Sequence, residues 1–194
     1  MKNLIIFVCL LTLFSCQTGE KQSVKIEGEL RQWNKITLVI NGPGTAEWDK
    51  INPFLDYKLE AVFMNGNKNY TVPGFYAADG NAAETSADAG NVWKIRFRPD
   101  IAGTWTYKIS FRKGKDIVVK DEAGLGVPVA GDGLEGCFEV APSGKTGNAL
   151  LRKGRIVNGG KGYYRFQDYD EIWLKNGADS PENFLAYSEF DQTL

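Results

Sequence analysis

The sequence predicts a mainly β protein, and its largest part, residues 24–142, is predicted to be an immunoglobulin-like antiparallel β-sandwich. Three observations carry this prediction. Apolar residues recur here with a period of two, which is typical of strands that bury one face. Turn residues separate about seven short runs of this kind, as in a sandwich. No segment of this region carries the stripe of an amphipathic helix.

The first expected elements are a strand at Ile36–Ile40 and a hairpin. The hairpin joins Tyr57–Phe63 to Tyr70–Val72 through the turn Asn65–Lys68, whose Asn-Gly pair favours a tight connection.

Two alternating runs form the clearest part of the pattern. The inward residues of the first run are Trp93, Ile95 and Phe97, and those of the second are Trp105, Tyr107, Ile109 and Phe111. Because the Pro99–Gly103 turn between them is short, the two runs are expected to pair antiparallel. The same turn also fits a corner at which a sandwich crosses from one sheet to the other.

The last expected strand of the sandwich is Phe138–Val140, and Cys137 before it is expected to be a buried small hydrophobe. A closed barrel is the alternative to the sandwich. A Pro/Gly-rich linker, Ala141–Gly147, then leads to residues 143–194, where a hairpin with the turn Asn158–Gly162 precedes an apolar strand, Ile172–Leu174.

The N-terminus predicts export. Lys2 precedes an apolar run, Leu4–Phe14, that is too short for a stable membrane span, so residues 1–15 are a predicted signal peptide. Leu13–Cys16 is similar to the cleavage box of bacterial lipoproteins, which makes Cys16 the predicted lipidation site and residues 16–23 a tether. An ordinary secretory signal is the alternative.

The composition excludes several classes of function. The chain has no histidine, so a Ser-His-Asp triad or a His-ligated zinc cannot form within it. The net charge is −1 and no basic stripe suggests nucleic acid as a partner. No cofactor and no metal site is predicted.

Five runs carry a resemblance to a known family. They are Trp48–Tyr57, Val72–Ser86, Trp93–Asp100, Gly103–Tyr107 and Gly177–Tyr187. They resemble an uncharacterised bacterial family, a β-sandwich domain of unknown function that precedes a TIM-barrel glycoside hydrolase module, often on lipoproteins of polysaccharide-degrading bacteria. The resemblance implies that residues 143–194 contain the first strand of an incomplete (β/α)8 barrel.

The resemblance also implies a function. Glycoside hydrolysis needs two carboxylates at one site, and in barrels of this kind they lie on later strands. The chain is therefore expected to be a non-catalytic accessory domain that braces the barrel, its main partner, and contacts polysaccharide. The alternatives are a standalone carbohydrate-binding or adhesive surface module and a structural spacer. The expected location is the bacterial outer membrane, on its cell-surface or periplasmic face, reached through the lipid anchor.

Candidate sugar contacts come first from the loop after the predicted barrel strand, with Asp179, Glu182 and Asn183. The alternative is a helix start in which Ser180 is the N-cap and Pro181 the first helical residue.

Aromatic residues outside the alternating sets supply a second group of candidates. Trp48 and Tyr76 are predicted to form part of an exposed platform for sugar rings, together with Trp33 or Phe75; packing in the core or between domains is the alternative. The long polar loop at 74–86 is expected to pack on the barrel. Its acidic residues, with Asp88, are an alternative calcium site, although their spacing matches no EF-hand.

Overall fold

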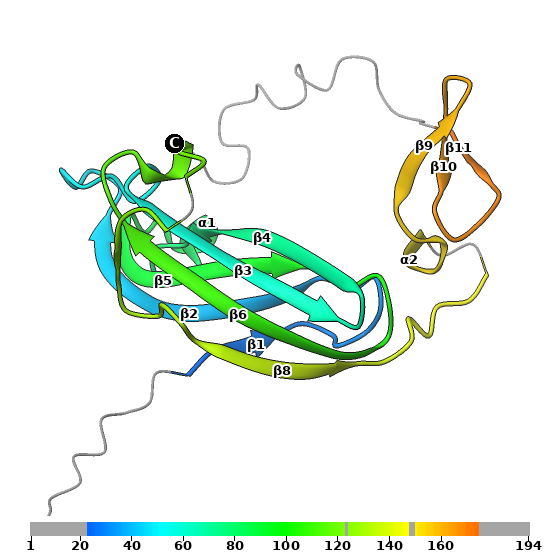
Figure 1. Ribbon diagram of the computed structural model, residues 1–194, viewed down its shortest axis with the longest axis horizontal. Helices are drawn as coiled ribbons and strands as arrows, with labels where there is room; N and C mark the ends of the chain where they lie inside the picture. Colours follow the sequence, from blue (N-terminus) through cyan, green and yellow to red (C-terminus); the bar gives the residue numbers. More distant parts are fainter. Residues whose placement is uncertain (1–22, 123, 148–149, 175–194) are drawn as a thin grey trace, which may run out of the picture.

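The computed structural model describes residues 23–122, 124–147 and 150–174 (Figure 1). These residues form a mainly β structure, which confirms the predicted class. One sheet has eight strands and curls around the core, and a second sheet near the C-terminal end of the described chain has three. The predicted signal segment lies outside the described residues.

The strands of the larger sheet are β1 (Lys25–Glu27), β2 (Ile36–Ala46), β3 (Tyr57–Asn65), β4 (Lys68–Tyr76), β5 (Ala89–Phe97), β6 (Gly103–Lys113), β7 (Val127–Pro128) and β8 (Glu135–Val140). Their order is β1-β2-β5-β4-β3-β6-β7, and β8 also pairs with β6. Every pairing between these strands is antiparallel. The predicted β3–β4 hairpin is confirmed, with Asn65 opposite Lys68 across a two-residue loop.

Strand β4 joins the two halves of the curled sheet. Its residues 68–73 pair with β3, and its residues 74–76 pair instead with β5. One half therefore contains β1, β2, β5 and the end of β4, and the other contains the start of β4 with β3, β6, β7 and β8. A strand that changes partners in this way makes a corner between two facing layers.

The core fills the space between these layers. All seven inward residues predicted for β5 and β6 are buried, which confirms the alternation. Rings from opposite layers are in contact: the Trp93 and Phe111 centroids are 4.8 Å apart, and the Phe63 and Phe97 rings stack at 4.1 Å. Aromatic packing of this kind adds to the free energy gained from burial.

The predicted pairing of β5 with β6 is wrong. Strand β5 pairs with β2 and β4, whereas β6 pairs with β3, β7 and β8. The two strands instead face each other across the core, where Phe97 and Trp105 lie 4.9 Å apart. The Pro99–Gly103 segment is thus a crossing between layers, which agrees with the expected corner at which the chain passes from one sheet to the other.

The edges of the curled sheet approach each other. The backbone of Arg31, just after β1, forms an isolated parallel bridge with Ala141, just after β8. The amides of Gln32 and Ala141 donate to the carbonyl oxygens of Ala141 and Leu30 at 2.8 and 2.9 Å. This contact links the segment after β1 to the end of β8 and so connects the two edges of the curled sheet.

Helices are short among the described residues. They are α1 (Ala82–Thr85), the 3-10 turn η1 (Ile117–Val119) and α2 (Leu150–Lys153). None is long and apolar enough to cross a membrane. The weak helical periodicity of the sequence agrees with this content.

The smaller sheet consists of β9 (Ile156–Gly160), β10 (Tyr163–Phe166) and β11 (Ile172–Trp173). The predicted hairpin around Asn158–Gly162 is confirmed as β9–β10. The predicted apolar strand appears as β11, which pairs antiparallel with β10. Several of its apolar residues are exposed, namely Ile156, Tyr163, Tyr164 and Ile172.

The expectation that Cys137 is buried is wrong, since its side chain is exposed on β8. Phe138 and Val140 on the same strand are buried. Because successive side chains of a strand point to opposite faces, Cys137 must point outward when Phe138 points inward.

Candidate functional site

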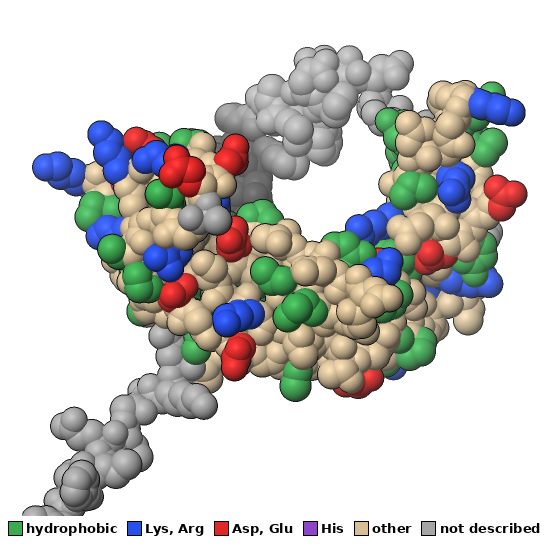
Figure 2. Space-filling view, in the orientation of Figure 1, with side chains coloured by type: hydrophobic (Ala, Val, Ile, Leu, Met, Phe, Trp, Pro, Cys, Tyr) green, Lys and Arg blue, Asp and Glu red, His purple; other side chains and the backbone are tan. Residues whose placement is uncertain are grey.

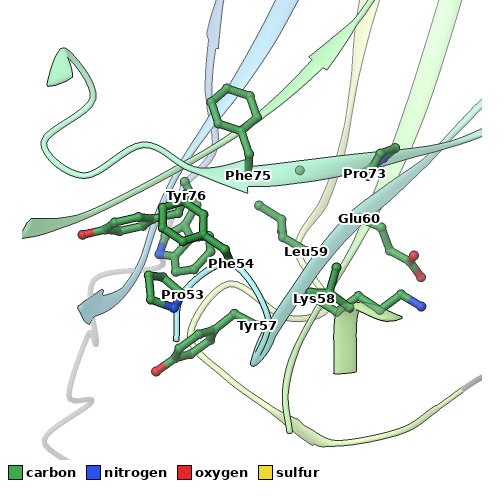
Figure 3. Close-up of a pocket in the computed structure, with 12 residues that line it drawn as sticks. Pro53, Phe54, Tyr57, Lys58, Leu59, Glu60, Pro73, Phe75 and Tyr76 are labelled. Carbon is green, nitrogen blue, oxygen red and sulfur yellow. The ribbon is translucent and has the colours of Figure 1, made fainter. Parts of the chain in front are cut away.

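An apolar groove of about 180 Å³ lies in the larger sheet at the point where β3 and β4 separate (Figure 3). Strand β3 pairs with β4 from Glu60 to Asn65. Before Glu60, Tyr57–Leu59 pairs with β6 but no longer with β4, because Gly74–Tyr76 of β4 pairs with β5. The change of partner opens a gap between the strands, and this gap is the groove. Its lining is Pro53, Phe54, Tyr57, Lys58, Leu59, Glu60, Pro73, Gly74, Phe75, Tyr76, Trp93 and Val118.

Gly74 is required where β4 changes partner. A Cβ at this position would lie 2.5 Å from two carbon atoms of Leu59 and 2.9 Å from Cγ1 of Ile95. No real side chain tolerates such distances without movement of the core. The missing side chain therefore lets Leu59 cross beneath β4 and form the floor of the groove.

The loop at 47–56 and the turn η1 form the outer wall of the groove. The Asp56 carboxylate holds them together, because it accepts hydrogen bonds from the amide of Asn52 at 2.9 Å and from the amide of Asp116 at 2.8 Å. The amide of Val118 donates to the carbonyl of Leu55 at 3.1 Å, and that of Gly114 donates to the carbonyl of Asp56 at 2.9 Å. Phe54 and Val118 are thereby placed on the same rim.

Hydrogen bonding lowers the pKa of two carboxyl groups in this loop. The amide of Asp116, and then that of Asn52, hold the pKa of Asp56 below its ordinary value. The amide of Ala46 and the hydroxyl of Thr45 do the same for the pKa of Asp49. Both carboxyl groups accept these hydrogen bonds more strongly when they are ionised, so the loop favours their charged forms.

An apolar rim surrounds the groove. Seven large apolar side chains that reach solvent lie on the 47–56 loop, on β4 and on η1: Trp48, Ile51, Phe54, Leu55, Phe75, Val118 and Val119. We call this set the groove rim. Phe54 is 51% exposed although its ring packs at 6.0 Å against Tyr76. Contiguous apolar surface on a folded protein is typical of a binding site.

The two aromatic residues predicted to contact sugar have different surroundings. Trp48 is 85% exposed on the 47–56 loop, as an open stacking face requires. Tyr76 is only 7% exposed, its ring lies 5.0 Å from that of Trp93, and its hydroxyl donates to the carbonyl of Thr45. The expectation of an exposed Tyr76 ring is therefore wrong, because the residue points into the core; one edge of it lines the groove.

The other predicted residues do not meet at the groove. Asp179, Glu182, Asn183 and Cys16 lie outside the described residues. In the 74–86 loop, the Asp79 carboxylate accepts hydrogen bonds from the amide of Asn81 and the hydroxyl of Thr85, both at 2.7 Å. Across the described ranges, no group of acidic or cysteine side chains is arranged to hold a metal ion.

The described lining of the groove is mainly apolar and contains a single acid. Glu60 is the one carboxylate among its described lining residues, beside the ammonium group of Lys58. Glycoside hydrolysis needs two carboxylates that flank the scissile bond. The remaining lining is aromatic and aliphatic, which supplies burial but no proton donor of suitable strength.

The residues that build this groove match a known domain family. The match to the model described as Domain of unknown function (DUF5060) covers residues 29–112. Over these residues the chain is similar to this domain family. The match includes β2 to β6 almost completely, and with them the 47–56 loop and the change of partner in β4. The resemblance to an uncharacterised domain family is confirmed for these residues.

The chain is also similar to one solved structure, over a small part of that protein. Among solved structures, the chain is similar to a protein from Bacteroides vulgatus ATCC 8482 described as a "putative glycoside hydrolase", with 25% sequence identity and a TM-score of 0.47. The similarity covers 73% of this chain and 20% of that one, so the chain spans a fifth of the other protein's length. A search of curated proteins found no match.

Sequence reasoning missed the groove. Its signal was Pro73-Gly74 inside an otherwise good strand, because both residues are unusual in the middle of a sheet and mark a bend or a close approach of other atoms. The other residues that line the groove come mainly from β3, from η1 and from the 47–56 loop. Such non-local contacts cannot be read from the local pattern.

We predict that the wall of the groove loosens in acid. The pKa of Asp56 is lowered in the folded state, so its stabilising effect is complete above the pKa of an unfolded Asp, about 3.9, and is lost as the pH falls through the lower folded value. In a pH titration by NMR, the amide shifts of Asn52 and Asp116 should move together, with a midpoint below about 3.9.

The amide of Ile109, which donates to the carbonyl of Leu134, is the internal reference and should stay constant over this range. An Asp56→Asn variant should lose the transition at both reporter amides. A midpoint at or above the ordinary Asp value, or an unchanged transition in the variant, would contradict the proposed role of Asp56.

Proposed function

We propose that this DUF5060-like domain is a non-catalytic accessory domain of a glycoside hydrolase, and that its groove and groove rim pack against the catalytic domain of the same polypeptide. The observation that carries the proposal is the apolar groove rim. Its exposed side chains come from three segments, and hydrogen bonds that Asp56 and Leu55 accept from η1 and the residue before it hold two of these segments together. Exposed apolar side chains on segments held in this way favour a protein partner.

The chemistry of the rim favours a protein over a sugar. Sugar sites combine an aromatic face with hydrogen-bonding groups that match hydroxyls. Here Ile51, Leu55, Val118 and Val119 supply aliphatic surface, which hydroxyl groups avoid, and the polar side chains of the lining are mainly Lys58 and Glu60 at one end. An aliphatic rim around a half-exposed Phe54 suits an apolar protein surface.

The sequence supports the identity of this partner. The resemblance described above is to a domain that precedes a TIM-barrel glycosidase, and the DUF5060 match covers its main part. We assign the facing layers of the larger sheet to an immunoglobulin-like sandwich, and β11 to the beginning of the barrel. The exposed apolar residues of the smaller sheet fit a sheet that acquires further strands or helices in a longer protein.

Glycan contact by Trp48 is the second candidate function. It belongs to the groove rim and is its most exposed member, at 85%. Retention of the chain on neutral polysaccharides that is lost in the Trp48→Ala variant would support this candidate function. Absence of retention on every glycan tested would contradict it.

Docking is tested by variants in the rim. In a longer protein that carries this domain ahead of a barrel, a protease site can be placed in the linker at residues 142–146. After cleavage, the two pieces should elute together. Phe54→Asp or Val118→Asp places a charge in the buried contact and should weaken the association of the pieces by about thirtyfold, as expected for a central contact residue.

The matched control is Val127→Asp, which introduces the same charge at an exposed valine on β7, outside the lining of the groove. It should leave the association unchanged. Equal weakening by all three variants, separation of the unaltered pieces at once, or a stop codon after residue 194 with no barrel encoded would overturn the docking proposal.

We further propose that the protein is exported and anchored in the outer membrane by lipid on Cys16. The native protein should incorporate labelled palmitate and sediment with membranes. A Cys16→Ser variant should lose the label and appear in the soluble fraction or remain unprocessed. An unlabelled native protein that is fully soluble would show that the signal is an ordinary secretory one.

A further inference from the structure

A second cavity lies at the junction between the two sheets, away from the groove. Its volume is about 410 Å³, and its lining comes from both sheets: Trp33, Arg98, Leu150, Gly154, Arg155, Ile156 and Phe166. The first two belong to the segments around the larger sheet, and the other five to α2 and the smaller sheet. None of these residues lines the groove described above.

Trp33 forms the base of this junction cavity. It is only 3% exposed and its backbone has a positive φ of 65°, an unfavourable conformation for a bulky residue. Its amide donates to the carbonyl of Pro99 at 2.8 Å, which fixes the segment. The indole N–H is buried with no hydrogen-bond acceptor. Strained residues and buried donors without acceptors reduce stability, so they are typical of functional sites.

Two arginines give the junction cavity its charge. The guanidinium of Arg155 lies 5.1 Å from the ring centroid of Tyr70 and 5.9 Å from that of Trp33. Arg98 is exposed at the end of β5. Neither guanidinium forms an ion pair with an acidic residue in the part of the chain that the structure describes. Two cations without anionic partners in one cavity are ready to bind an anion.

The acidic groups nearby do not cancel this charge. Asp100 is buried and its carboxylate already binds the hydroxyl of Tyr70 at 2.5 Å and the ammonium of Lys68 at 3.2 Å. Asp168 faces Gly154, where an added Cβ would lie 2.7 Å from its Oδ2. The cavity lining contains Arg98 and Arg155 and no acidic residue among those described, so its lining carries positive charge.

A row of basic residues leads to the junction cavity. Lys94, Arg96 and Arg98 alternate along β5 with the buried residues, so they share the outer face and are spaced roughly 7 Å apart. Arg96 lies 4.9 Å from the ring centroid of Phe75. In Figure 2, Lys and Arg side chains lie where the two sheets meet. The row and the cavity together make a basic track that ends beside aromatic rings.

We propose that the junction cavity binds a saccharide that carries an oxyanion, a carboxylate or a sulfate. Arg98 and Arg155 bind the anionic group, since guanidinium forms paired, charge-assisted hydrogen bonds with such groups. The buried rings of Trp33 and Phe166 form the floor of the cavity, and the exposed side chains of Leu150 and Ile156 contact the apolar face of the sugar. The basic row on β5 binds further anionic residues of the same polymer. This site is separate from the groove, so it stands even where docking through the groove does not.

The test is retention of the whole chain in native gels that contain one of four polysaccharides. Polygalacturonate is compared with its fully methyl-esterified form, and dextran sulfate with dextran, so that each pair differs only in the charged group. We expect the charged member of at least one pair to retard the chain and the neutral member to leave it unaffected. The pair that responds distinguishes carboxylate from sulfate.

Arg98→Met and Arg155→Met should each weaken this retention by at least about tenfold, the value expected for a lost charge-assisted hydrogen bond. The matched control is Lys108→Met, which removes a positive charge on the outer face of β6 and should change retention little. Thermal unfolding of each variant confirms that it is folded, and Arg155→Lys, which keeps the charge, should retain part of the binding.

Three results would overturn the proposal. They are absence of retention by all four polysaccharides, equal retention by the charged and neutral member of both pairs, and equal weakening by Lys108→Met. The last would show general attraction between charges, which salt also abolishes, rather than a site at the junction.

Discussion

The change of partner in β4 is the constraint on which the rest of the larger sheet depends. One strand pairs with β3 over its first part and with β5 over its last part. This corner lets a continuous sheet fold into two facing layers, whose aromatic residues then meet across the core. Gly74 makes the corner possible, because a side chain there would collide with Leu59 and Ile95. The groove is the space that this corner leaves open.

Both proposed sites lie where elements of the fold meet. The groove lies at the corner and takes its wall from the 47–56 loop and η1, which Asp56 connects. The junction cavity lies where the smaller sheet meets the segment around Trp33. The first surface is apolar and the second is cationic with aromatic rings. An accessory domain with one surface for a protein and another for an acidic glycan could hold an enzyme close to its substrate while contributing no catalytic group.

Part of the fold could be predicted from sequence. The alternation of Trp93, Ile95 and Phe97 with charged residues identified a strand and its buried face, because side-chain direction in a strand depends only on the neighbours along the chain. Strand pairing was harder. The short Pro99–Gly103 turn predicted a hairpin, but the chain crosses between the layers there, and Phe97 and Trp105 meet across the core.

The sites were less predictable than the strands. An aromatic residue outside an alternating set can be buried or exposed, and Tyr76 and Trp48 have opposite outcomes that only tertiary contacts decide. Arg98 was placed on the outer face of its strand, but its meeting with Arg155 depends on how a segment more than fifty residues later packs. The loop with Asp179, Glu182 and Asn183 remains a prediction from sequence.

The most direct test of the central claim, that the groove rim is covered by a catalytic domain, is hydroxyl-radical footprinting of the side chains. Oxidation of Phe54 and Val118 is measured in this chain and in the longer protein, with Val127 as a reference outside the groove. The account predicts strong protection of Phe54 and Val118 in the longer protein and unchanged oxidation of Val127. Equal oxidation of Phe54 and Val118 in both proteins would contradict it.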